Sequence, residues 1–251
     1  MMRVTETVKH LIIINVIFFA ATFLPSLHDV LYNNLSLYYI ENPNFKLWQL
    51  VSHMFMHGNF WHIFFNMFVL ALFGSALEML WGRNRFLVFY FITGIGAGLV
   101  YTAVNYFQFH QIFDALVHNG ISKEYLFQAL NTNNDPQLLL QSVPENDLAG
   151  LFNVYLSTAV GASGALYGVL AAFAFKFPNT ELYLMFIPIP IKAKYLIPAL
   201  VGLDLFSGLT GQSIFGGFGG GGIAHFAHVG GALVGYLLML YFNRKQFKRW
   251  D

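Results

Sequence analysis

Gly161-Ala162-Ser163-Gly164-Ala165-Leu166-Tyr167-Gly168 places a single hydroxyl among glycines and alanines, inside a long apolar segment of the chain. Membrane helices use such small residues to approach one another closely, so helix packing alone can explain most of this pattern. The hydroxyl of Ser163 still needs a partner, because an unpaired polar group in hydrocarbon is costly. The small neighbours also leave room for a peptide backbone beside Ser163, so the stretch suits a nucleophile as well.

The composition around this stretch is that of a membrane protein. The chain is 57% hydrophobic, contains 28 phenylalanines and is only 10% charged, whereas soluble domains carry about 25% charged residues. We therefore predict an integral membrane protein. The chain has no cysteine, which excludes disulfides, thiol catalysis and zinc sites with cysteine ligands.

The apolar runs predict an all-α polytopic membrane protein, a six-helix bundle in a single domain over residues 1–251. The first run could also be a signal peptide, but we prefer a retained span because the chain after it never becomes a soluble domain. The six spans are predicted at approximately 11–24, 58–80, 86–106, 151–175, 193–209 and 224–242.

Two of the connections between these spans are distinctive. Residues 107–150 are acidic and polar, and they predict a long extramembrane loop with one or two short amphipathic helices, one of them near 121–130. Residues 211–222 are rich in glycine and predict a hinge or lid.

The basic residues predict the orientation of the spans. Two lysines, Lys46 and Lys123, belong to one side of the predicted bundle. The other lysines and arginines gather on the opposite side: Arg3, Lys9, Arg83, Arg85, Lys176, Lys192, Lys194, Arg244, Lys245, Lys248 and Arg249. Cytoplasmic segments carry the excess of Lys and Arg, so both termini are predicted to be cytoplasmic and the 107–150 loop extracytoplasmic.

This topology predicts that polar residues from three helices meet at one depth. Ser163 is expected about a third of the way into its span, on the order of 15 Å below the outer surface. The polar residues of two other spans start from the same side: His57, His62 and Asn66 in one, and His225 and His228 in the other. Polar groups inside membranes are costly and usually functional, so packing alone becomes a poor explanation.

The residue types at this depth suit acyl transfer. A serine needs a base, which a neutral imidazole provides near pH 7, and Tyr167 could stack on that imidazole. His62 and Asn66 lie four apart on one helical face, where they could donate to an oxyanion. No acidic residue is expected in place to complete a triad, because Asp204 lies near the outer end of its span, so a Ser–His dyad is predicted. Close helix contact would come from two strips of small residues: Gly164, Gly168 and Ala172, facing Ala227, Gly231 and Gly235.

Four motifs of the chain resemble those of the rhomboid family of intramembrane serine proteases, and the resemblance covers nearly the whole length. Gly-Ala-Ser163-Gly is similar to GxSG, and His62-Ile-Phe-Phe-Asn66 is similar to HxxxN, with His57 upstream. Ala227-His228-Val-Gly-Gly is similar to AHxGG, and Glu78 followed by Gly82-Arg83-Asn-Arg85-Phe86 is similar to the connection after the second helix. Where the family often has Trp-Arg before that helix, this chain has Trp48-Gln49, and its 107–150 loop is longer than in the six-span core.

The resemblance implies a serine endopeptidase that cuts transmembrane substrates near the extracytoplasmic face. It implies Ser163 as the nucleophile and His228 as the general base. It further implies an oxyanion hole from His62, Asn66 and the Ser163 backbone N–H, with Tyr167 packed against His228 and His57 supporting the first loop. The expected partners are transmembrane proteins and the lipid bilayer, without nucleic acid, metal or other cofactor. We expect a bacterial inner membrane; the oligomeric state stays open.

Three alternatives remain at this stage. An inactive rhomboid-like binding protein would lack the serine or the histidine, and this chain has both. A transporter would be expected to show paired inverted repeats, which we do not find. A histidine-based metal site is conceivable from His53 and His57 or from His225 and His228, but there is no His-Glu-x-x-His motif, and no carboxylate is expected at that depth.

Overall fold

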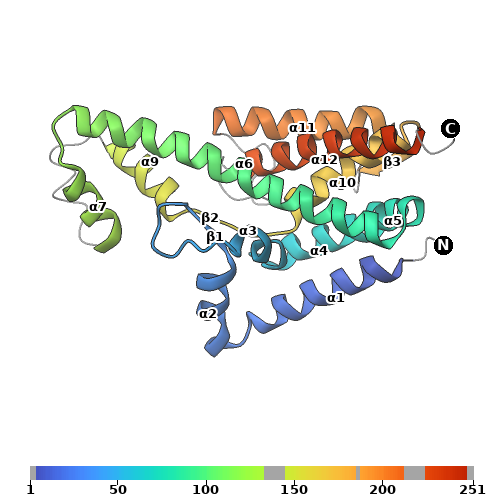
Figure 1. The fold of residues 1–251 in the computed structure, drawn as a ribbon, viewed down its shortest axis with the longest axis horizontal. Coiled ribbons are helices and arrows are strands. Elements are labelled where there is room, and N and C mark those ends of the chain that lie inside the picture. The colour runs from blue at the N-terminus through green and yellow to red at the C-terminus, as the bar shows by residue number, and fades with distance from the viewer. Residues whose placement is uncertain (1–3, 133–144, 185–186, 212–223, 248–251) are drawn as a thin grey trace.

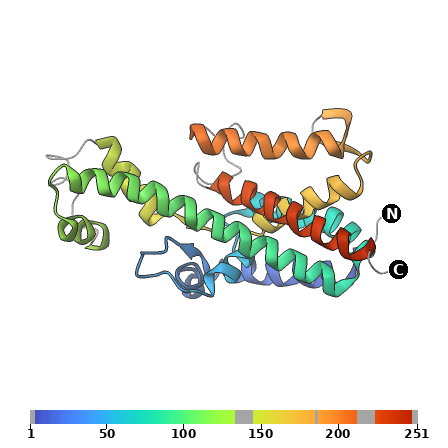
Figure 2. The same cartoon turned by 45° about the horizontal axis from the view of Figure 1, so that its top comes forward.

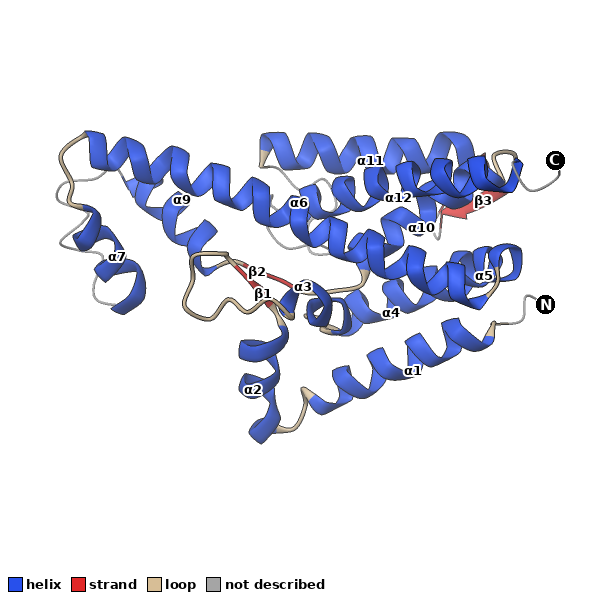
Figure 3. Cartoon of the chain, in the orientation of Figure 1, coloured by secondary structure: helices blue, strands red, loops and turns tan. Residues whose placement is uncertain are grey.

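A computed structural model describes residues 4–132, 145–184, 187–211 and 224–247. Helices dominate these residues, as predicted (Figure 3). They are α1 (Glu6–Ala21), α2 (Pro25–Leu35), α3 (Gln49–Ser52), η1 (His53–Phe55), α4 (Phe60–Val69), η2 (Leu70–Gly74), α5 (Ser75–Trp81), α6 (Arg83–His118), α7 (Lys123–Thr132), α9 (Glu145–Leu156), α10 (Ser163–Lys176), α11 (Ala193–Thr210) and α12 (Ala224–Phe247). Two small antiparallel pairs join β1 (Leu37–Tyr38) to β2 (Thr158–Ala159), and β3 (Glu181–Leu184) to β4 (Ile187–Lys192).

Three helical stretches among the described residues are long and apolar enough to cross a bilayer. They are Phe60–Trp81, Arg83–His118 and Ala224–Asn243. Helix α10 is also apolar but has only 14 residues. The chain is thus a polytopic helical membrane protein, while the count of six spans stays a prediction.

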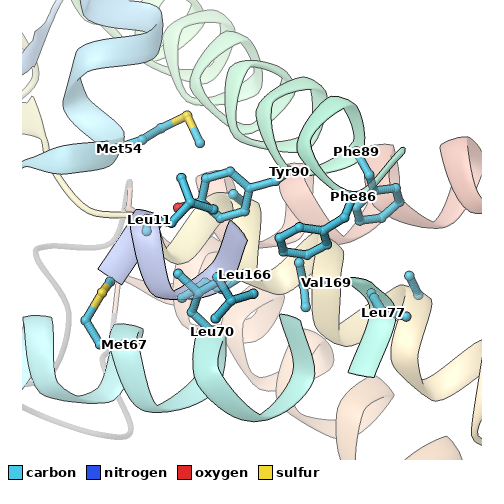
Figure 4. Close-up of a cluster of buried hydrophobic side chains, with 14 of the residues drawn as sticks. Leu11, Met54, Met67, Leu70, Leu77, Phe86, Phe89, Tyr90, Leu166 and Val169 are labelled. Atoms are coloured by element: carbon cyan, nitrogen blue, oxygen red, sulfur yellow. The ribbon is translucent and has the colours of Figure 1, made fainter. Parts of the chain in front are cut away.

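The main core lies where α1, α4, α5, α6 and α10 meet (Figure 4). Large side chains fill it, among them Leu11, Leu70, Phe86, Tyr90 and Val169 (Figure 4). The start of α1 is bound to this core by Glu78 of α5. Its carboxylate accepts hydrogen bonds from the Thr5 hydroxyl and from the backbone N–H groups of Thr7 and Val8. A carboxylate at a helix N-terminus pairs with N–H groups that have no partner within the helix, which stabilises the packed position of α1.

Helix α6 is longer than predicted and carries a second core. It was expected to end at 106 but continues to His118, so at about 1.5 Å per residue it is about 54 Å long. Its distal half projects beyond the other helices and packs against α7 and α9 (Figures 1 and 2). We call residues 107–132 with α9 the extension. A short helix close to the predicted 121–130 is present as α7, but both ends of the predicted loop were wrong. Helix α6 continues past 106 because Phe109, Phe113 and Leu116 continue its apolar face, and α9 includes residues 151–156, which had been assigned to a span.

The chain ends and the basic turns lie at one end of the bundle. Helix α1 begins and α12 ends at this end, next to the α5–α6 turn and the β3–β4 hairpin (Figures 1 and 2). Several of the counted basic residues are in these segments, including Lys9, Arg83, Lys176 and Lys192. This arrangement agrees with the charge distribution from which the orientation was predicted. The predicted hinge at 211–222 lies, apart from Gly211, outside the described residues.

Candidate active site

A pocket of about 380 Å³ lies beside Ser163, where α10 and α12 begin. Its walls come from the first loop, which is the segment 22–59 between α1 and α4, and from α4, α6, the segment before α10, and α12. The lining residues are His53, Gly58, Asn59, His62, Ala97, Gly98, Tyr101, Thr158, Ala159, Val160, Gly161, Ser163, Gly164, Ala224, Ala227 and His228.

Ser163 is the first residue of α10 and does not lie within a longer span, so the predicted helix over 151–175 is wrong. Helix α9 ends at Leu156, and Thr158–Ala159 then pair with β1. Gly161 has φ of 116°, which favours glycine, and its N–H donates to the His53 carbonyl at 2.9 Å. These contacts hold the segment extended up to the helix start. Ser163 therefore lies at a helix N-terminus, where backbone N–H groups have no partner within the helix.

The shortness of α10 explains how Ser163 can lie below the membrane surface. Fourteen residues span about 21 Å, compared with about 30 Å for the hydrocarbon core. If Lys176 at its other end lies at one interface, Ser163 lies roughly 10 Å inside the other. On this premise the depth of Ser163 comes from the shortness of α10, and it is about 10 Å instead of the predicted value of about 15 Å.

His228 of α12 lies directly against Ser163. Its Nε2 is 2.8 Å from the Ser163 Oγ, and its ring is stacked on Tyr167 with centroids 4.4 Å apart and planes at 4°. The predicted close contact of the two small-residue strips is confirmed. A Cβ added at Gly231 would lie 1.9 Å from the Gly164 carbonyl oxygen, and one added at Gly235 would lie 2.4 Å from the Gly168 Cα. The near contact of these backbones sets the distance between serine and histidine.

His62 reaches the pocket from α4, and Asn66 lies one turn further along the same helix, outside the pocket lining. A Cβ added at Gly161 would lie 2.6 Å from His62 Nε2, so the ring packs against the backbone just before Ser163. The Gly58 N–H donates to His62 Nδ1 at 3.4 Å, which leaves the proton of a neutral ring on Nε2, facing the pocket. One hydrogen of the Asn66 amide is used on the His62 carbonyl at 2.7 Å, and the second is available.

The first loop supports this wall of the pocket. The His57 ring is buried and lies edge-on to His62 with centroids 5.1 Å apart, and its carbonyl accepts from the Tyr32 hydroxyl at 2.8 Å. Gln49, which stands where an arginine was expected, is fully buried. Its amide accepts from the Lys46 N–H at 3.1 Å and donates to the Asn44 carbonyl at 2.9 Å. A neutral side chain thus holds the turns of this loop through backbone groups.

Asp204 lies in contact with His228, although it was predicted to lie away from the histidines. Its Oδ1 is 3.2 Å from His228 Nδ1 and 2.5 Å from His225 Nδ1. The expectation that no carboxylate reaches the depth of the histidines is therefore wrong. The position of Asp204 along the chain was correct, but the pattern could not show that α11 turns this residue toward α12.

These three side chains are also a candidate metal cluster. One ligand atom from each of Asp204, His225 and His228 lies within 4.8 Å of the others. The present geometry is one of hydrogen bonds among the three, with His228 Nε2 directed at Ser163. A cation here would have to displace the protons of both Nδ1 atoms.

The chain also matches known proteins along most of its length. Residues 44–127 and 137–245 match the family model of the rhomboid domain. The chain belongs to the rhomboid family. The matched residues include the serine, the three histidines that line the pocket and the strips that hold α10 against α12.

Rhomboid relatives cover most of this chain. It is 27% identical over 205 residues to rhomboid protease AarA of Providencia stuartii, covering 77% of this chain and 55% of that protein. It is 27% identical over 233 residues to the mitochondrial presenilin-associated rhomboid-like protein A of Danio rerio, covering 92% and 46%. The chain thus spans about half the length of these curated relatives.

Proposed function

We propose that this rhomboid is an intramembrane serine endopeptidase that hydrolyses peptide bonds of transmembrane substrates. The observation that carries the proposal is the 2.8 Å approach of Ser163 Oγ to His228 Nε2 beside a pocket. A nucleophile and a base within hydrogen-bond reach are the signature of covalent acyl transfer. The name of one relative, rhomboid protease AarA, supports the same reaction class.

The first half of the reaction would form an acyl-enzyme. Ser163 Oγ attacks the scissile carbonyl carbon while its proton passes to His228 Nε2. The carbonyl π electrons move to the oxygen, which becomes an oxyanion. When the intermediate collapses, the C–N bond breaks and His228 gives its proton to the leaving amine, so that the acyl group stays on Ser163.

The oxyanion would be stabilised by hydrogen-bond donors from α10 and α4. We assign this role to the Ser163 N–H at the start of α10, the Nε2–H of His62 and the second amide hydrogen of Asn66. Fixed donors in a site of low dielectric stabilise developing charge without reorganising. Their origin on two different helices means that the packing of α4 against α10 determines how well they act together.

The second half would release the product and restore the enzyme. Water gives a proton to His228 Nε2 and attacks the acyl carbon, and the second intermediate then expels Ser163 Oγ, which recovers the proton. The pocket lies opposite the end where the basic residues gather. We therefore infer that cleavage takes place near the extracytoplasmic face, in a bacterial inner membrane, with both termini cytoplasmic.

The test is Ser163-dependent cleavage by the purified protein. Wild type, Ser163→Ala and His228→Ala are reconstituted with a transmembrane substrate and are also treated with a fluorophosphonate that labels activated serines. We expect wild type to cleave and to be labelled, and both variants to lose activity, with the double variant no worse than either single one. Ser207→Ala, a buried serine of α11 outside the pocket, is the matched control and should keep full activity.

Other outcomes would support the alternatives. A folded wild-type protein that neither cleaves nor is labelled would be an inactive rhomboid-like binding protein. Cleavage that persists in Ser163→Ala and is lost on chelation would indicate a metal site at Asp204, His225 and His228. Cleavage by wild type that resists chelation and needs Ser163 supports the serine mechanism.

A further inference from the structure

Asp204 is a buried carboxylate whose surroundings are unusual for a residue in the apolar helix α11. It is only 8% exposed, on the face of α11 that packs against α12. A buried carboxylate is costly unless it is hydrogen-bonded or paired. Its partners therefore indicate why the chain can hold it there.

Two donors converge on this carboxylate. His225 and His228 approach Oδ1 through their Nδ1 atoms at 2.5 and 3.2 Å. Tyr167 stacks on the His228 ring. Asp204 thus touches His228 directly at Nδ1, while Tyr167 covers one face of the same ring.

The contact determines which nitrogen of His228 carries the proton. An ionised carboxylate only accepts hydrogen bonds, so the neutral imidazole facing it must place its proton on Nδ1. The Nε2 lone pair is then directed at the Ser163 hydroxyl 2.8 Å away. When His228 takes the serine proton it becomes a cation, and Asp204 supplies the opposite charge at the other end of the ring.

We propose that Asp204 is a positioning residue, which orients His228 through Nδ1 and stabilises its protonated form, so that Ser163, His228 and Asp204 form a triad. This inference rests on the proposed peptidase function. It replaces the dyad predicted from the sequence. His225 shares the carboxylate oxygen and fixes its direction, which makes His225 a support for Asp204.

A role in helix packing is the competing explanation, and charge and shape separate the two. Asp204→Asn keeps the shape and removes the charge, whereas Asp204→Glu keeps the charge and adds a methylene. If Asp204 acts on His228 by charge, the Glu variant retains more activity than the Asn variant. If it only fills the contact between α11 and α12, the order is reversed.

The experiment measures kcat and KM for a transmembrane substrate with purified wild type, Asp204→Asn, Asp204→Glu and the control Ser207→Ala. Ser207 lies on α11 one turn after Asp204 and is also buried. We expect Asp204→Asn to lower kcat by roughly 10²- to 10⁴-fold with little change in KM, the upper value being the loss seen for the same change in a soluble Ser-His-Asp protease. Ser207→Ala should match wild type, and thermal unfolding checks that each variant is folded.

The pH profile of kcat/KM is a second measurement, and removing Asp204 would leave it unchanged if Asp204 only packed α11 against α12. The groups facing His228 are Ser163 and Tyr167 on α10, Asp204 on α11, His225 on α12 and His62 on α4. Asp204 is the only negative one among them, so its removal disfavours protonated His228, and the acid limb of kcat/KM should move to lower pH.

The outcomes separate this inference from the function on which it rests. An active wild type together with an Asp204→Asn variant of equal kcat and unchanged pH profile, or one more active than Asp204→Glu, would overturn the triad and leave the peptidase intact. If Asp204→Asn does not fold, the kcat of folded Asp204→Glu decides: a carboxylate acting by charge retains most of the activity, and a loss as large as that expected for Asp204→Asn contradicts the role. If wild type shows no Ser163-dependent cleavage, the proposed function and the triad fall together.

Discussion

The contacts of α10 with α12 and α6 beside Ser163 and the extension formed by residues 107–132 with α9 are packed by different kinds of residue. In the bundle, α10 meets α12 and α6 through glycine and alanine, and a Cβ added at Gly164 would lie 2.5 Å from the Ala97 Cβ. In the extension, the core consists mainly of phenylalanine, tyrosine and leucine, with Phe109 and Phe113 stacked at 5.2 Å. Helix α6 belongs to both regions and changes its packing along its length.

The difference is the one expected if the extension lies outside the hydrocarbon, as predicted from the sequence. Lipid tails are as apolar as leucine, so membrane helices associate mainly through close backbone contact and polar bonds. Beyond the hydrocarbon, burial of large apolar side chains drives association. Helix α6 is about 24 Å longer than a hydrocarbon core of about 30 Å, and the residues in its packing contacts change from small to large along its length. Backbone contact sets the geometry of the site, whereas the extension depends on side-chain volume.

The largest effect is expected from a bulky residue in the backbone contact. Gly231→Leu should prevent α12 from packing against α10, because even a Cβ there would lie 1.9 Å from a backbone oxygen. We expect loss of the folded bundle and of Ser163 labelling, measured by thermal unfolding and fluorophosphonate reaction. Gly202→Leu on α11 is the matched control, since no atom lies within 4 Å of an added Cβ. A stable, labelled Gly231→Leu protein would contradict this view of the bundle.

The next largest effect is expected from the loss of the Asn66 amide, a polar group assigned to the oxyanion hole. Asn66→Ala should lower kcat by roughly 10²-fold or more while KM changes little, because an oxyanion contact strengthens only in the transition state. Steady-state kinetics on a transmembrane substrate measure both constants. A rise in KM at constant kcat would instead make Asn66 a substrate-binding residue.

A change within the extension should alter stability there and spare the active site. Phe113→Ala removes a buried ring from the second core and should cost about 3–5 kcal/mol locally. Hydrogen exchange should rise in α7 and α9, while Ser163 labelling keeps its rate. Phe107→Ala, at a position 72% exposed on the same helix, is the control for losing a phenylalanine. Slower labelling in Phe113→Ala alone would show that the two regions are coupled.

The smallest effect is expected for a carboxylate–imidazole pair outside the bundle. Glu41 lies 3.2 Å from His110 at a partly exposed position, and such pairs contribute about 0.2–1 kcal/mol. Glu41→Gln should therefore change the midpoint of thermal unfolding little and leave kcat unchanged. The same chemical pair at Asp204 and His228 is expected to matter far more, so equal effects of the two substitutions would contradict the distinction.

The sequence by itself determined the class of the protein and singled out Ser163, His62 and His228, three of the residues that line the pocket. Hydropathy and charge are properties of the chain, so the membrane class and the apolar runs could be predicted without a fold. Motifs such as His62 with Asn66 are local, because residues four apart share a helical face wherever that helix lies. The strips of Gly164 with Gly168 and of Gly231 with Gly235 likewise show which faces can meet.

Only the tertiary structure decided where α10 begins and what lies behind His228. The helix break before Ser163 depends on the pairing of β2 with β1 and on the bond from the Gly161 N–H to His53, contacts over more than 100 residues of chain. The contact of Asp204 with His228 depends on how α11 is rotated against α12, where Gly208 faces the Phe226 ring. Hydropathy cannot report either feature, because the rotation of a helix and the break of an apolar run are set by partners distant in sequence.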